Sequence, residues 1–178
     1  KTDPAKHYAL VNVAGEAGIF LTTDNFVTLT ATGEPADADN GIPATDFTRG
    51  QAFYDLVIEL NPTDDSEVYV GGINMHLSQN SGKNWIQLSK WSDNPSMNLL
   101  SIPFVHADIH AITFQPGSTT RALIGSDGGV SLASNLAASA NNANTIEDRN
   151  LGYNVTQFYY GDINQINFAD GDDFIGGT

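Results

Sequence analysis

Three titratable side chains stand at alternate positions in the run His106-Ala107-Asp108-Ile109-His110. In an extended backbone, alternate residues point to one face and lie about 7 Å apart. His106, Asp108 and His110 would then share a face on which imidazole and carboxylate groups bind a divalent metal or a polar ligand. The structural alternative is that Asp108 only fixes the orientation of the two imidazoles, and that the three side chains join neighbouring sheets.

Further carboxylates occur in two turn-like segments. Asp127 precedes two glycines, so its carboxylate would lie beside a bare backbone that suits a saccharide hydroxyl or a cation. The alternative there is a turn with a capping Asp. Nearer the end of the sequence, five oxygen-bearing side chains fall within twelve residues: Asp162, Asn164, Asp170, Asp172 and Asp173. Their chemistry suits Ca²⁺, although the spacing is not that of an EF-hand loop, and a solvated acidic turn is the alternative.

The composition limits the class of partner. The 178 residues include 7 Lys plus Arg against 21 Asp plus Glu, a formal net charge of −14. Because no basic surface is left to neutralise phosphates, the sequence argues against nucleic acid and anionic membranes and favours cations or neutral polymers. The absence of Cys excludes disulfides, thiolate metal ligands and a cysteine nucleophile. No apolar run approaches the roughly 20 residues of a membrane-spanning helix, so membrane insertion is not expected.

The elements that must position these side chains are short strands. Asn, Asp and Gly are abundant, and this composition favours turns over helices. About a dozen β-like runs recur at the spacing of a sandwich, barrel or propeller. They are 7–13, 18–23, 26–30, 53–60, 68–72, 74–78, 85–88, 108–114, 121–125, 130–134, 157–163 and 173–176. The segments 34–48 and most of 131–146 are expected to be long loops.

Internal repetition favours the propeller among these all-β folds. Residues 54–80 and 109–135 share the order of apolar strand, Pro, polar turn, strand ending in Gly, and strand ending in Ser, at an offset of 54 to 56 residues. Repeats of this length with four short strands are typical of propeller blades, and a ring closes with four or more blades. The chain is therefore expected to be an incomplete propeller of about three to three and a half blades, with the remainder of the propeller or a larger assembly as partner. The expected organisation is the end of one blade (1–31), a loop (32–52), a blade (53–91), a loop (92–107), a blade with a long loop (108–150) and the start of the next blade (157–178).

One turn within the repeat carries a recognisable motif, Ser78-Gln79-Asn80-Ser81-Gly82-Lys83-Asn84-Trp85. It resembles the Asp-box, or bacterial neuraminidase repeat, with Asn80 in place of the Asp and Asn84 in place of the Thr. Ser and Asn side chains cap backbone N–H groups, Gly82 allows a positive φ, and Trp85 is expected to pack between sheets. The segments 22–24 and 134–135 look like eroded copies. Trp91, in the following loop, is instead a candidate for ligand contact.

A broader resemblance is carried by residues 106–135 and the later segments Gln157-Phe158-Tyr159 and Gly176-Gly177-Thr178, and it covers roughly residues 50–178 and, more weakly, residues 1–31. Their order is similar to that of sortilin-type and xyloglucanase-like propellers of secreted proteins, common in Bacteroidota. The resemblance implies a β-propeller and a secreted or cell-surface bacterial protein. Function is less constrained, because this superfamily includes glycoside hydrolases, receptors and adhesive surface modules.

Two functions remain open on this basis. The first is a non-catalytic propeller that serves as a scaffold or binds a glycan or a protein. The second is an exported glycoside hydrolase of the xyloglucanase-like kind, for which Asp108 and Asp127 are the candidate acid and base. A sialidase is disfavoured because it needs several Arg to hold the substrate carboxylate. The sequence offers only Arg49, Arg121 and Arg149, none in a recognisable sialidase setting.

Overall fold

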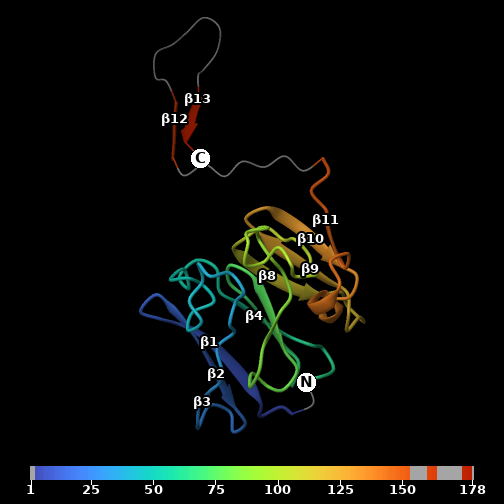
Figure 1. The fold of residues 1–178 in the computed structure, drawn as a ribbon. Helices are drawn as coiled ribbons and strands as arrows, with labels where there is room; N and C mark the ends of the chain where they lie inside the picture. The colour runs from blue at the N-terminus through green and yellow to red at the C-terminus, as the bar shows by residue number, and fades with distance from the viewer. Residues whose placement is uncertain (1–2, 153–159, 164–173, 178) are drawn as a thin grey trace, which may run out of the picture.

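The structure is a computed structural model that describes residues 3–152, 160–163 and 174–177. The first sheet is antiparallel and follows the chain in the order β1-β2-β3 (Figure 1). Its strands are β1 (His7–Val13), β2 (Glu16–Thr22) and β3 (Thr30–Ala31). The turn between β1 and β2 is closed by Asn12, whose side-chain oxygen accepts a hydrogen bond from the N–H of Gly15 at 2.7 Å.

Two four-stranded antiparallel sheets follow, and each pairs its strands in the order of the sequence. The first contains β4 (Val57–Leu60), β5 (Val68–Gly71), β6 (Met75–Ser78) and β7 (Ile86–Gln87). The second contains β8 (Ile109–Phe114), β9 (Ala122–Ser126), β10 (Gly129–Ala133) and β11 (Ile146–Asp148), with the short 3₁₀ helix η1 (Ala137–Asn141) before β11. A further antiparallel pair joins β12 (Tyr160–Ile163) to β13 (Phe174–Gly177).

The core lies between these sheets, where β5 and β6 are buried on both faces. Between the two four-stranded sheets, the rings of Tyr69 and Phe114 meet edge to face with centroids 5.4 Å apart. The sheets approach closely at Gly71, where an added Cβ would lie 2.7 Å from the side chains of Val57 and Ile109. A second apolar cluster joins β2 to β5 through Ile19 and Val70. This packing brings β4 and β8 side by side (Figure 1).

The turn after β6 has a hydrogen-bonded twin after β2. The Ser78 hydroxyl accepts from the N–H of Gly82 at 2.8 Å, and the Asn80 side chain accepts from the N–H of Asn84 at 2.9 Å. The turn after β2 has two bonds with the same spacing of four residues. The Thr22 hydroxyl accepts from the N–H of Phe26 at 3.0 Å, and the Asp24 side chain accepts from the N–H of Thr28 at 2.9 Å.

The two turns differ in the residue that adopts the left-handed conformation. Gly82 has φ +82° and Phe26 has φ 68°. This conformation suits glycine and costs another residue about 1–2 kcal/mol. Phe26 therefore carries backbone strain that Gly82 avoids.

The all-β prediction is confirmed, and several local expectations are corrected. The segment 131–146 is not mostly loop, because it holds the end of β10, the helix η1 and the start of β11. Residues 26–30 do not form a strand, since the first three belong to the turn that Thr22 and Asp24 close. Ser134 does not repeat that turn, because its hydroxyl donates to the carbonyl of Thr145 across the sheet. Within the described residues, no helix is long and apolar enough to cross a membrane.

Candidate functional site

The structure brings together side chains from three segments at the start of β4 and β8. Asp127 is the centre of the group. It accepts a hydrogen bond from the Tyr54 hydroxyl at 2.9 Å and is paired with Nε2 of His110 at 2.7 Å. The Tyr54 and His110 rings meet edge to face, with centroids 4.8 Å apart. Tyr54 and Asp127 are 73 residues apart in sequence, so only the packing of the two sheets unites them.

A β-bulge in β8 and the turn between β9 and β10 determine where the side chains of His110 and Asp127 point. The register between β8 and β9 shifts between Ile109 and Ala111, so His110 is the extra residue of a β-bulge. Bulges re-aim a side chain out of the regular ladder, and here the imidazole reaches the turn between β9 and β10. Asp127 lies in that turn, next to the paired residues Ser126 and Gly129. The N–H of Ile109 donates to the carbonyl of Gly72 at 2.8 Å and anchors the start of β8 to the neighbouring sheet.

Asp55 is the most unusual member of the group. It is fully buried, and neither carboxyl oxygen has a hydrogen-bond partner on another described residue. Burial, followed by the charge of Asp108, raises the pKa of Asp55 from 3.8 to about 8. Asp46 and Asp127 raise it further. Asp55 is therefore a neutral carboxylic acid at neutral pH, able to donate one hydrogen bond and accept others.

Asp108 completes the cluster. Burial is the main cause that raises the pKa of its carboxyl, and the charge of Asp127 adds to it, whereas His110 and His106 lower it. Its backbone has φ 63°, which is a strained conformation for a non-glycine residue. Such outliers concentrate at functional sites, and the surrounding contacts must hold them in place. We define the acidic cluster as Tyr54, Asp55, Asp108, His110 and Asp127.

This arrangement offers complementary hydrogen-bonding groups to one ligand. Asp127 is an acceptor and the partly exposed Tyr54 ring supplies a flat apolar surface, with the neutral Asp55 acid buried beside them. Within the described part of the chain, no group of three or more His, Cys, Asp or Glu side chains is arranged to hold a metal ion. The acceptor groups and the Tyr54 ring suit a hydroxyl-bearing or otherwise polar organic ligand.

His106 stands apart from the predicted alternating trio. The strand begins only at Ile109, and Asp108 is left-handed, so the segment is not extended as the alternation required. The His106 ring contacts the carbonyl of Ala107 through Nδ1 at 3.1 Å, and its side chain packs where a Cβ on Gly128 would clash. The position of the His106 side chain leaves no room for a Cβ at residue 128, which accounts for the glycine there. The hydrogen bond of the His106 ring is to the carbonyl of Ala107 and not to the carboxylate of Asp127.

The other predicted residues lie elsewhere. The indole N–H of Trp91 donates to Asp39 at 2.8 Å and ties its loop to the 34–48 segment. Trp85 is half-buried against the β2 and β5 cluster, and its indole N–H donates to the carbonyl of Gly33 at 2.7 Å. Among the candidate calcium ligands, Asp162 lies in β12 opposite Ile175. Asn164, Asp170, Asp172 and Asp173 lie outside the described residues, so the Ca²⁺ site stays a prediction.

Tyr54 and Asp55 were missed from the sequence. The signal for Asp55 was an acidic residue immediately ahead of the apolar run 56–58, in the same place as Asp108 ahead of β8. Each acid precedes the first strand of its sheet, but the sequence alone does not specify that the two carboxyls lie close together. No protein-family model matches the sequence, and a search of curated proteins finds no match either.

Proposed function

We propose that this chain is a segment of a β-propeller from an exported or cell-surface bacterial protein, and that it binds a glycan without cleaving it. The site of binding is the acidic cluster. The observation that carries this proposal is the meeting of three partly exposed polar side chains from two sheets, Tyr54, His110 and Asp127, beside the buried Asp55. The Asp127 carboxyl oxygens have lone pairs beyond those used by Tyr54 and His110, and these accept a hydrogen bond from a ligand hydroxyl.

Support for a propeller comes from the order of the strands. Two consecutive sheets have four antiparallel strands each, and the first strands of both, β4 and β8, lie side by side (Figure 1). Blades of a propeller pair their strands in this order and pack face to face around a common centre. The repeated turn after β2 and β6 agrees with a decayed Asp-box in successive blades. The resemblance to sortilin-type and xyloglucanase-like proteins supports export.

Support for a neutral polar ligand comes from charge. The cluster has three carboxyl groups, and none of them has an Arg or Lys partner within the described residues. Phosphates and carboxylates are repelled by such a site, whereas sugar hydroxyls pair with both donors and acceptors. The partly exposed ring of Tyr54 offers an apolar surface to the C–H face of a sugar ring.

A second function, glycoside hydrolysis, is favoured by one observation. Asp55 is held neutral while Asp127 is paired with His110 in the same cluster. A glycosidase needs one protonated and one ionised carboxyl on opposite sides of the scissile bond. Asp55 is fully buried, however, and a general acid must reach the leaving oxygen. Binding without cleavage is therefore the better account.

A panel of β-glucan oligosaccharides separates the two functions when binding and released reducing ends are measured on the same samples. We expect saturable binding to at least one member, no release of reducing ends, and loss of binding in Asp127→Asn. The control is Glu147→Gln, which removes a carboxylate that is 65% exposed on the far edge of the β8 sheet. Release of reducing ends that disappears in Asp108→Asn would establish the hydrolase instead.

A further inference from the structure

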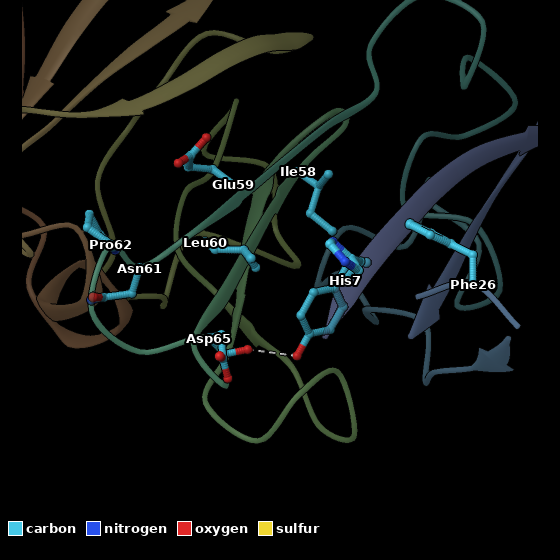
Figure 2. Close-up of a pocket in the computed structure, with 9 residues that line it drawn as sticks. His7, Phe26, Ile58, Glu59, Leu60, Asn61, Pro62 and Asp65 are labelled. Carbon is cyan, nitrogen blue, oxygen red and sulfur yellow. Dashed lines mark hydrogen bonds between the residues drawn. The ribbon is translucent and has the colours of Figure 1, made fainter. Parts of the chain in front are cut away.

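A pocket of about 410 Å³ lies between β1 and β4, away from the residues of the acidic cluster. Figure 2 shows its lining side chains, which come from the start of β1, the turn after β2, and β4 with the residues that follow it. One wall is formed by His7, Tyr8 and Phe26, and the other by residues 58–62 with Asp65. The volume falls within the range of pockets that hold a small ligand or a few residues of a peptide.

The pocket follows the edge of a strand. Residues 58–62 are consecutive, and consecutive residues of a strand point to opposite faces. A cavity that touches all of them must therefore run along the strand's edge and not over one face. β4 is the terminal strand of its sheet, and within the described residues no backbone hydrogen bond joins it to a strand other than β5. Alternate N–H and C=O groups of β4 thus face the pocket unpaired by any strand.

The two sides of this edge differ in chemistry. Ile58 and Leu60 point to one side, and Glu59 points to the other. Figure 2 shows Glu59 and His7 on opposite sides of the β4 ribbon. The His7 ring is stacked on Phe26 with centroids 5.0 Å apart, so the first side is apolar and aromatic. The second side carries the Glu59 carboxyl, which forms no ion pair with any other described residue; burial raises its pKa, and the neighbouring N–H of Leu60 acts to lower it.

Phe26 is a second feature that indicates a binding site for a partner at this pocket. It is 52% exposed at the pocket, although its left-handed backbone would be relaxed by the glycine that the twin turn has at position 82. Its ring stacks on His7 at the pocket and otherwise leaves half of its surface exposed. Its retention at the rim of the pocket is explained if the ring contacts a partner.

We propose that the free edge of β4 binds an extended segment of a partner protein as an added β-strand. Main-chain hydrogen bonds to residues 58–61 supply the affinity, and alternate side chains of the partner select the sequence. Apolar residues of the partner lie against Ile58, Leu60 and the Phe26 rim. Lys or Arg residues lie on the opposite side, toward Glu59, in agreement with the net charge of −14. Five residues of strand span about 16 Å, so four or five partner residues fill the site.

The probe is the peptide acetyl-Lys-Val-Lys-Val-Lys-amide, titrated into the full chain while backbone amide signals are followed by NMR. We expect the largest shifts at residues 58–61. Two N-methylated analogues, methylated at either alternate set of amides, remove the donors on one edge each. The analogue methylated on the edge that faces β4 should bind at least about tenfold more weakly, a loss of about 1.4 kcal/mol, and the other should bind like the parent.

Two variants test the side chains. Glu59→Gln should weaken the Lys peptide several-fold and leave acetyl-Thr-Val-Thr-Val-Thr-amide unchanged, whereas the exposed Glu147→Gln should alter neither. Phe26→Gly should weaken both peptides without lowering the stability of the turn, and Val27→Ala, an 81% exposed neighbour outside the pocket, is its control. The proposal is overturned if neither peptide binds, if both N-methylated analogues bind like the parent, or if the shifts map to another strand. It is also overturned if acetyl-Glu-Val-Glu-Val-Glu-amide binds as tightly as the Lys peptide.

Discussion

Replacing Asp55 by Asn should change how the stability of the protein depends on pH. Asp55 has a pKa of about 8 in the folded chain, because burial and the charge of Asp108 disfavour its ionised form. In the unfolded chain the pKa of an Asp is about 3.9. Between these values the folded state binds one more proton than the unfolded state, so the wild type loses stability as the pH rises from about 4 to about 8. The amide introduced by Asp55→Asn is neutral throughout and removes this loss.

The magnitude follows from the same two pKa values. At about 1.4 kcal/mol per pH unit, a rise from 3.8 to about 8 corresponds to ~6 kcal/mol if the site stays rigid. Asp55→Asn should therefore match the wild type near pH 3 and exceed its stability by an amount that grows above pH 4 and approaches ~6 kcal/mol near pH 8.5.

Urea unfolding followed by fluorescence of Trp85 and Trp91 measures this difference at each pH. Glu34 is a second carboxyl whose burial raises its pKa, to about 7, so the wild-type slope alone is not diagnostic. The comparison of wild type with Asp55→Asn isolates Asp55, and Glu34→Gln should keep the Asp55 part of the slope. If the free energy of unfolding changed with pH in the same way in the wild type and in Asp55→Asn, the claim that Asp55 is a buried neutral acid would be refuted.

Three further substitutions test the fold. Asp37→Asn should cost about 3 kcal/mol in thermal or urea unfolding at pH 7, because it removes the charged partner of buried His76, 3.4 Å away. Burial acts to raise the pKa of Asp37, but the nearby His76 and the hydrogen bonds from Asn74 and the N–H of Asp39 prevail and lower it, so this contribution should vanish as the pH falls below about 4. Gly82→Ala should cost about 2 kcal/mol or more, whereas Phe26→Gly should change the free energy of unfolding by less than about 1 kcal/mol, and equal losses would contradict the strain assigned to position 26. Trp85→Ala should cost about 2–3 kcal/mol, less than a fully buried Trp, and an unchanged melting temperature would remove its role as an anchor.

Strands with clear alternation and clear turns were predictable. The run 7–13 was predicted with the bounds of β1, and β5, β6 and β8 begin and end within one residue of the predicted runs. The failures have a common cause. The side chains of Thr22 and Asp24 close a turn where the residue types predicted a strand. β11 forms only because it pairs with β10, from which a long connection separates it. Neither contact has a periodic signature.

The candidate site was predictable only in part. His110, Asp108 and Asp127 were singled out because their residue types and spacing suggest chemistry. Tyr54 and Asp55 were not, since their role depends on packing between two sheets that the sequence does not specify. The β-bulge at His110 and the left-handed Asp108 also decide which side chains meet, and neither follows from alternation.

The central claim is that the acidic cluster binds a glycan and does not cleave it. The most direct test is an NMR titration of the full chain with β-glucan oligosaccharides, following the His110 imidazole and the Asp55 and Asp127 carboxyl carbons, with reducing ends assayed in the same tubes. The account predicts saturable shifts at these three side chains, their absence in Asp127→Asn, and a constant amount of reducing ends. Unchanged signals with every oligosaccharide, or an increase in reducing ends that depends on Asp108, would contradict it.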